Sequence, residues 1–206
     1  MDLRLDGKRV VLTAGGAGIG RVTLQTLVEA GARVVTCDVD QAALDRLRGE
    51  LPEVPAIPAD VAEPADVDRL FELAAEQLGG LDILINTAGI AGPTGPIEEI
   101  APDDWRRTLE VNLTGQYLCA RRAVPPIRAA GGGAIVNLSS AAGRFGFALR
   151  TPYAASKWAV VAPGCRSPTS ASAGQSTPET AVGPGAGGVA VMRRGVPAIR
   201  VAGRLV

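Results

Sequence analysis

Histidine is absent from this chain of 206 residues. Its absence excludes catalytic triads and dyads in which an imidazole is the base, and it removes the commonest protein ligand for zinc. Aromatic residues are also few, at 3% of the sequence. We therefore expect no metal site, and any acid–base catalysis has to use other side chains.

The chain also lacks an excess of charge and a long apolar run. Lys and Arg together number 21, as do Asp and Glu, so the formal net charge is zero. A neutral chain argues against nucleic acid or an anionic membrane as the main partner. No apolar stretch is long enough to cross a membrane, and the first residues, MDLRLDGKRVVLT, do not have the pattern of a signal peptide.

Cysteine is scarce, and its three copies, Cys37, Cys119 and Cys165, lie far apart. An odd number of widely spaced cysteines predicts free thiols in a reducing compartment rather than a disulfide framework. We therefore expect a cytoplasmic protein.

Short apolar runs alternate with helical patterns along the first 162 residues. Continuously apolar strands that alternate with helices are typical of a parallel sheet covered on both faces. The sequence therefore predicts an α/β protein with a Rossmann-type doubly wound sheet. The predicted strands are 10–13, 32–37, 54–58, 81–86 and 134–138, and the predicted helices are 21–30, 41–51, 66–78, 102–128 and 152–162.

A glycine-rich turn joins the first predicted strand to the first predicted helix. It reads Thr13-Ala14-Gly15-Gly16-Ala17-Gly18-Ile19-Gly20. Glycines at such a turn let the backbone approach a pyrophosphate, and the helix N-terminus supplies N–H donors. A plain glycine-rich turn is the structural alternative, but its place between a strand and a helix favours dinucleotide binding.

Polar and small residues follow the next strands. Asp38 ends the second strand, where its carboxylate can accept hydrogen bonds from an adenosine ribose and would repel a 2′-phosphate, which favours NAD over NADP. Asp60 and Val61 follow the third strand and either face the adenine or form only a loop. The fourth strand runs into Asn86-Thr87-Ala88-Gly89, which either lets a cofactor pass close by or makes a tight turn.

Candidate catalytic residues lie in the second half of the chain. Tyr153 and Lys157 are four positions apart, so they share one helix face. An ammonium there favours the phenolate over the phenol, which suits a tyrosine to proton transfer. Ser140 can hold a substrate oxygen, and Asn112 has apolar neighbours that make it a candidate buried residue. Taken singly, each has an ordinary structural interpretation, as a packing, capping or surface residue.

Together these motifs resemble the short-chain dehydrogenase/reductase family over about residues 5–162. The family's turn, Thr-Gly-x-x-x-Gly-x-Gly, matches Thr13, Gly18 and Gly20, with Ala14 in place of the first glycine. Its Asn-Asn-Ala-Gly motif corresponds to residues 86–89. Its catalytic Asn, Ser, Tyr and Lys correspond to Asn112, Ser140, Tyr153 and Lys157.

The resemblance implies NAD(P)-linked oxidation of a secondary alcohol or reduction of a ketone. Tyr153 would exchange a proton with the substrate oxygen, Lys157 would bind the nicotinamide ribose, and Ser140 would orient the substrate oxygen. Asn112 would help to hold a water. The resemblance also implies a homo-oligomer formed through the helices that carry Asn112 and Tyr153. Two alternatives stay open: a 3-oxoacyl thioester reductase, and an inactive remnant that at most binds a dinucleotide.

The pattern changes after residue 162. Residues 163–188 have no apolar period, and residues 189–206 show no clear strand or helix. We therefore divide the chain into a catalytic domain, residues 1–162, and an atypical tail, residues 163–206, which we expect to be poorly ordered and to lack the family's C-terminal strands. Pro163 would end the Tyr153 helix and weaken a family-like oligomer. One hypothesis is that residues from about 162 onward derive from a reading-frame shift or an alternative terminus, and a family-like tail in another frame of the gene would support it.

Overall fold

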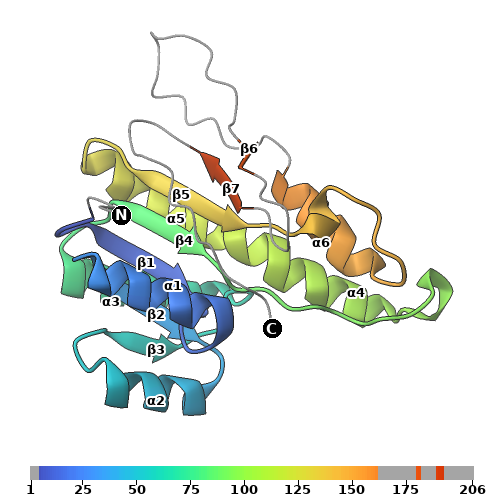
Figure 1. Cartoon of the computed structure of the whole chain (residues 1–206), viewed down its shortest axis with the longest axis horizontal. Helices are drawn as coiled ribbons and strands as arrows, with labels where there is room; N and C mark the ends of the chain where they lie inside the picture. Colours follow the sequence, from blue (N-terminus) through green and yellow to red (C-terminus); the bar gives the residue numbers. More distant parts are fainter. Residues whose placement is uncertain (1–4, 162–179, 182–188, 193–206) are drawn as a thin grey trace, which may run out of the picture.

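The core of the molecule is a parallel sheet. The computed structural model describes residues 5–161, 180–181 and 189–192. Its first five strands pair in parallel in the order β3-β2-β1-β4-β5, and Figure 1 shows them side by side. This arrangement confirms the predicted fold class. The strands are β1 (Arg9–Thr13), β2 (Arg33–Asp38), β3 (Ala56–Pro58), β4 (Ile83–Asn86) and β5 (Ala134–Leu138).

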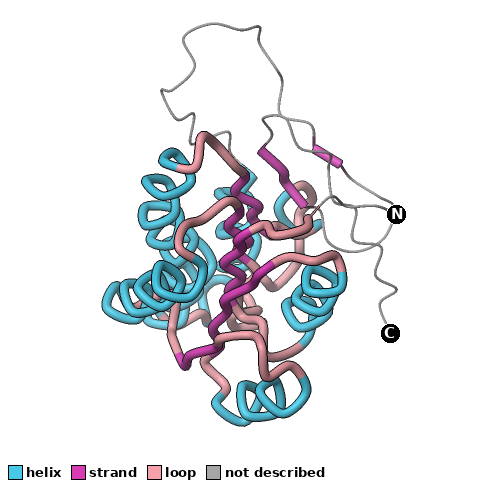
Figure 2. The backbone as a smooth tube through the Cα atoms, turned by 90° about the vertical axis from the view of Figure 1, so that its left-hand side faces the viewer, coloured by secondary structure: helices cyan, strands magenta, loops and turns pink. Residues whose placement is uncertain are grey.

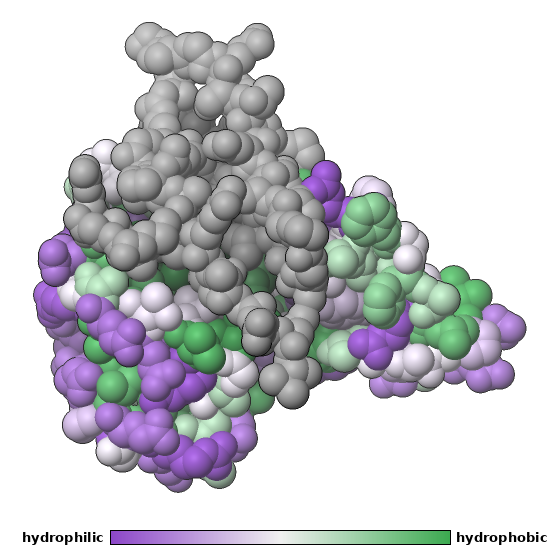
Figure 3. Space-filling model, viewed as in Figure 1, coloured by the Kyte–Doolittle hydropathy of each residue, from purple (hydrophilic) through white to green (hydrophobic). Residues whose placement is uncertain are grey.

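Helices cover both faces of the sheet, which Figure 2 shows edge-on. The exposed surface over α1 and α2, at the lower left of Figure 3, is mostly hydrophilic, as expected for helices that bury one face only. The helices are α1 (Gly18–Glu29), α2 (Gln41–Glu50), α3 (Pro64–Leu78), α4 (Pro102–Leu109), α5 (Gly115–Ala129) and α6 (Thr151–Val161), with short turns η1 (Ile97–Glu99), η2 (Glu110–Thr114) and η3 (Ala141–Gly143). Among the described residues, no helix is long and apolar enough to cross a membrane.

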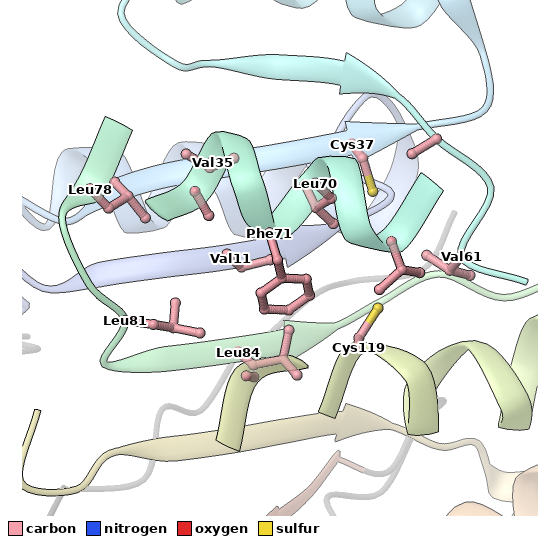
Figure 4. Close-up of a cluster of buried hydrophobic side chains, with 14 of the residues drawn as sticks. Val11, Val35, Cys37, Val61, Leu70, Phe71, Leu78, Leu81, Leu84 and Cys119 are labelled. Atoms are coloured by element: carbon pink, nitrogen blue, oxygen red, sulfur yellow. The ribbon is translucent and has the colours of Figure 1, made fainter. Parts of the chain in front are cut away.

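Alternate residues of the strands point into two separate apolar cores. In β1, Val10 and Leu12 pack with buried side chains of α1 and α2, whereas Val11 points to the opposite core formed with α3 and α5. Figure 4 shows the second core, where Phe71 of α3 points to the sheet beside Leu84. Because both faces are covered, the strands are apolar at most of their central positions, and this explains why they read as short apolar runs.

The parallel register brings the ends of the strands to one edge. Thr13 lies opposite both Cys37 and Asn86, and Asn86 lies opposite Asn137. Residues that directly follow these positions are therefore neighbours in space although they are distant in sequence. This edge is where parallel α/β sheets bind ligands.

The long helix predicted over residues 102–128 contains an irregular turn. It consists of α4 and α5, joined by the π-helical turn η2, and α5 extends to Ala129. A π turn inserts one extra residue into the helical repeat, and such turns are frequent at functional sites. Asn112 lies in this turn and is fully buried. The predicted long helix is therefore confirmed, whereas the π turn within it was not predicted.

Two short strands lie beyond α6, where the sequence showed no clear element. Strand β7 (Val189–Met192) pairs antiparallel with β5, and β6 (Thr180–Ala181) pairs antiparallel with β7. The remaining positions of 163–206 lie outside the described residues, as do Pro163 and Gly164. The predicted division of the chain at residue 162, the predicted character of the tail and the reading-frame hypothesis therefore stay predictions.

Candidate active site

The end of β1 is tied to the segment that follows β4. Thr13 Oγ1 accepts hydrogen bonds from the backbone N–H groups of Thr87 and Ala88, each at 3.1 Å. Thr87 Oγ1 donates in return to the Thr13 carbonyl oxygen. Thr13 is therefore a buried structural support that fixes the position of residues 86–89 relative to the glycine-rich turn.

The glycine-rich turn leads directly into α1. Gly15 N–H donates to the Cys37 carbonyl oxygen at 3.0 Å, which holds the turn against β2. A side chain at Gly20 would overlap the Ala14 carbonyl oxygen, so this position requires glycine. Ala14 itself adopts a left-handed conformation with φ of 55°. This conformation suits the glycine of the family pattern better than alanine.

The N-terminus of α1 is open to a ligand. Ala17 is the N-cap residue, and its methyl side chain accepts no hydrogen bond from the first N–H groups of the helix. A Cβ at Gly18 would meet no atom within 4 Å, and Ile19 is largely exposed. Free backbone donors at the positive end of a helix dipole fit a pyrophosphate. Gly18, Ile19 and Gly20 therefore lie where the sequence predicted a phosphate-binding turn.

Asp38 lies beside this turn at the end of β2. Its Oδ2 accepts from Gly16 N–H at 3.0 Å, and its Oδ1 accepts from Asp40 N–H at 3.1 Å. Both bonds orient the carboxylate at the site edge of the sheet. The next residue in the chain, Val39, is exposed.

The side chains of Asp60 and Val61 make structural contacts. Asp60 pairs with Arg107 and accepts from Ala62 N–H at 2.9 Å. Val61 is buried in the core that includes α3, and a Cβ at Gly115 would lie 2.7 Å from its Cγ2. The predicted adenine contact of these two residues stays a prediction.

The segment after β4 contains a buried polar atom that has no partner among the described residues, and a glycine that leaves space beside it in the site. Asn86 Nδ2 donates to Asn137 Oδ1 at 2.8 Å, but the buried Asn86 Oδ1 has no hydrogen-bond partner among the described residues. At Gly89, a Cβ would lie 3.2 Å from Asn112 Oδ1 and 3.4 Å from Lys157 Nζ. Gly89 therefore leaves room where two predicted catalytic residues meet.

Asn112 links three parts of the site. Its Oδ1 accepts from Ile90 N–H at 2.7 Å, and its Nδ2 donates to the Ile90 carbonyl oxygen at 2.9 Å and to Ser156 Oγ at 3.0 Å. Ser156 Oγ in turn donates to the Tyr153 carbonyl oxygen at 2.7 Å. The buried amide thus fixes α6 against the segment after β4.

Tyr153 and Lys157 lie on one face of α6, as their spacing predicted. Lys157 Nζ is 5.7 Å from the centre of the Tyr153 ring and donates to the Leu138 carbonyl oxygen at 3.0 Å. Lys157 is only 4% exposed, and burial lowers the pKa of its ammonium to about 8. The charge of this side chain is therefore held next to the phenol rather than in solvent.

Ser140 lies on the loop between β5 and α6. Its Oγ accepts from Ala142 N–H at 3.2 Å, so it caps the short turn η3, which packs against α6. The neighbouring Ser139 donates to the Lys157 carbonyl oxygen at 2.8 Å. Among the described residues, no hydrogen bond joins Ser140 to Tyr153.

Several supporting residues were missed by the sequence analysis. Ser139, Ser156 and Thr87 tie the predicted site residues together, and Arg150 lies over the Tyr153 ring. In the sequence, Ser156 is marked only by its place directly before Lys157 in a predicted helix. The contacts of the others join distant segments, which no local pattern marks.

The carboxyl ends of the strands lie at one edge of the parallel sheet, together with the N-terminus of α1 and the Tyr153–Lys157 pair. This arrangement is of the Rossmann type. The family model described as "short chain dehydrogenase" matches residues 8–163. The chain belongs to this family.

Individual relatives agree with the family. The chain is 38% identical over 162 residues to L-fucose dehydrogenase of Bos taurus, covering 79% of this chain and 60% of the relative. It is 41% identical over 150 residues to cis-4-hydroxycyclohexanecarboxylate dehydrogenase of Sinomonas cyclohexanicum, covering 71% and 60%. A 7α-hydroxysteroid dehydrogenase solved with NADH and 7-oxo glycochenodeoxycholic acid superposes with a TM-score of 0.73 at 33% identity, covering 77% and 63%. The chain thus spans about 60% of the length of these two curated relatives.

Proposed function

We propose that the protein is a nicotinamide-dependent dehydrogenase that interconverts a secondary alcohol and a ketone. The observation that carries this proposal is the Tyr153–Lys157 pair, in which a buried ammonium lies 5.7 Å from the centre of the phenol ring. Family membership supports it, because the curated relatives named above are dehydrogenases of hydroxyl compounds.

The described residues fit a dinucleotide. The N–H groups of Gly18, Ile19 and Gly20 would hold the pyrophosphate. The space at Gly89, between Asn112 and Lys157, and the orphaned Asn86 Oδ1 fit a polar group that passes along this edge. When bound, the nicotinamide ring supplies hydride transfer at the substrate carbon.

The further cofactor contacts come from backbone and side chains around these groups. Gly15 would line the turn, Ala88 would lie along the cofactor, and Lys157 would donate to the nicotinamide ribose. The adenine contact from Asp60 and Val61 completes the proposed set.

The cofactor is NAD rather than NADP. Asp38 is the residue that favours this choice, because its carboxylate is fixed beside the turn by Gly16 and Asp40. A carboxylate here accepts hydrogen bonds from the two ribose hydroxyls and repels a 2′-phosphate.

Proton transfer is the task of Tyr153. In the oxidation direction, the substrate hydroxyl gives its proton to the phenolate oxygen of Tyr153, and in reduction the proton returns. The ammonium of Lys157 stabilises the phenolate by its charge. Ser140 Oγ accepts from Ala142 N–H, which leaves its own proton to donate to the substrate oxygen. Asn112 is a positioning residue, since its bonds fix α6.

The experiment that tests this function compares wild type with Tyr153→Phe. Purified protein is assayed for NADH formation with L-fucose, cyclohexanol, 3-hydroxybutyrate and cis-4-hydroxycyclohexanecarboxylate. We expect turnover of at least one alcohol, and a loss of kcat of about 100-fold or more in Tyr153→Phe, because general acid–base catalysis contributes a factor of that order.

The controls separate catalysis from binding. NADH binding, measured by fluorescence, should be the same in both proteins, because the ring of Tyr153 is retained. NADH binding without turnover of any alcohol would favour the alternative, a dinucleotide-binding protein without activity. Turnover of a 3-oxoacyl thioester with NADPH would favour the thioester reductase.

A further inference from the structure

Arg150 lies against the proposed acid–base residue. Its guanidinium carbon is 5.6 Å from the centre of the Tyr153 ring, so Arg150 and Lys157 are both within reach of one phenol. Its Nη1 donates to Thr94 Oγ1 at 2.6 Å. Thr94 belongs to the segment that follows β4, which contributes Gly89 to the site. The guanidinium therefore joins the loop before α6 to the segment after β4.

The charge of Arg150 is not neutralised by the described residues. None of their carboxylates lies within ion-pair distance of its guanidinium. Its Nε is buried and has no hydrogen-bond partner. Nη2 has none either among the described residues. Arginine presents a planar fork of donors that matches a carboxylate, and an unsatisfied buried donor is costly. The described residues therefore leave part of the Arg150 guanidinium without an acceptor.

The backbone around Arg150 holds the side chain in place. Leu149 adopts a left-handed conformation with φ of 59°, which is uncommon for a leucine. Its carbonyl oxygen accepts from Gly95 N–H at 2.9 Å. Strained backbone of this kind persists where surrounding contacts fix it, and it concentrates at ligand sites. Together, the Gly95–Leu149 and Thr94–Arg150 bonds clasp the loop before α6 to the segment after β4.

Lys157 cannot take the place of Arg150 as an anion receptor. It is 4% exposed and already donates to the Leu138 carbonyl oxygen. Arg150 directly precedes α6, and its carbonyl oxygen accepts from Ala154 N–H at 2.9 Å, so the positive end of the helix dipole adds to its field. The same loop exposes Phe145 and Phe147, which are 66% and 52% exposed. These side chains suit an apolar carbon skeleton.

We infer that Arg150 is a substrate-binding residue for a carboxylate, so that the substrate is a hydroxy acid, oxidised to an oxo acid, with an apolar skeleton. This inference rests on the proposed function. Arg150 would hold the carboxylate while Tyr153 exchanges the proton at the hydroxyl. The hydride goes to NAD, so the carboxylate itself takes no part in the chemistry.

Matched pairs of substrates test the inference. The acids are cis-4-hydroxycyclohexanecarboxylate and 3-hydroxybutyrate, and each is compared with its neutral methyl ester. Wild type should have a kcat/KM at least 30-fold higher for one acid than for its ester. Arg150→Met should lose that preference mainly through a higher KM for the acid, so that its kcat/KM falls at least tenfold more for the acid than for the ester.

Two further variants control for structure. Arg150→Lys keeps the charge but loses the planar fork, so its preference for the acid should be intermediate. Arg144→Met removes an exposed arginine on the same loop and should change neither substrate. Equal loss for acid and ester in Arg150→Met would assign Arg150 a structural role only. Loss in Arg144→Met, or equal turnover of acid and ester by wild type, would also overturn the inference.

A binding measurement keeps the inference separate from the proposed function. Tyr153→Phe saturated with NADH is titrated with 4-oxocyclohexanecarboxylate and with its methyl ester by calorimetry. The acid should bind at least tenfold more tightly than the ester, and the difference should vanish when Arg150→Met is added. If no alcohol is turned over but this difference is found, the dehydrogenase proposal fails while the carboxylate site stands. If there is no difference, the site fails.

Discussion

At the scale of the single residue, the burial of Lys157 makes the stability of the protein depend on pH. Burial lowers the pKa of its ammonium from 10.5 to about 8. Between these two pH values the unfolded chain binds more protons than the folded chain, so the contribution of Lys157 to the free energy of unfolding rises with pH. Below about pH 8 the folded protein bears the full cost of a buried charge, about 3 kcal/mol.

Lys157→Met should therefore stabilise the protein at pH 7 while it removes activity. The variant avoids the cost of the buried charge but loses the hydrogen bond to Leu138, worth about 1 kcal/mol. We expect a net gain of about 1–2 kcal/mol, or about 2–8 °C in melting temperature. Thermal unfolding at pH 7 and at pH 10.5 measures it. The gain should shrink at the higher pH, and a variant that melts below wild type at pH 7 would contradict this account.

Ala14 is a second residue whose conformation predicts a measurable effect. An L-residue in the left-handed region costs about 1–2 kcal/mol, and glycine avoids this cost but gains freedom in the unfolded chain. Ala14→Gly should therefore raise the free energy of unfolding by up to about 1 kcal/mol, as measured by urea titration. Ala130→Gly is the matched control, because Ala130 is exposed, has φ of −76° and gains nothing from glycine. A gain of equal size in both variants would refute the argument.

At the scale of the element, the start of α1 has to approach the preceding turn closely. Glycine in a helix normally costs about 1 kcal/mol relative to alanine, yet Gly20 has no room for a methyl group. The geometry of the turn therefore outweighs helix propensity at this position.

Two glycine substitutions in helices should thus have opposite signs. Gly20→Ala should lower stability and weaken NADH binding tenfold or more, because the methyl group would displace the Ala14 carbonyl. Gly49→Ala in α2 should raise stability by about 0.5–1 kcal/mol, since nothing lies within 4 Å of its Cβ position. Urea titration and NADH fluorescence measure both. Gly20→Ala that binds NADH as wild type does would show that the turn is more adaptable than described.

The helices, strands and turns also show how much of the structure could be predicted from the sequence. The five parallel strands were found within a few residues, because burial on both faces leaves apolar runs that can be recognised locally. The π turn between α4 and α5 was missed, since its reason lies in the bonds of Asn112 to Ile90 and Ser156. The individual role of Arg150 was not predicted for a similar reason: its partner Thr94 is 56 positions away. Other candidate site residues could be predicted from their positions in the sequence, because they directly follow a strand or lie four positions apart on a helix.

At the scale of the whole molecule, cofactor binding is coupled to folding. A ligand that binds only the folded state stabilises it by about 2.7 kcal/mol at a concentration 100 times its Kd. NADH should therefore raise the melting temperature by several degrees, and NADPH at the same concentration should raise it less. Asp38→Ala should narrow the gap between the two cofactors. An equal shift with NADH and NADPH in wild type would contradict the proposed role of Asp38.

The outer edge of the sheet at β3 bears on how the protein behaves at high concentration. This strand has only three residues and ends in Pro58, whose nitrogen carries no hydrogen to donate. A short edge with a proline offers an incoming strand few backbone partners. This end of the sheet is thus protected against the strand-to-strand pairing that starts amyloid-like aggregation.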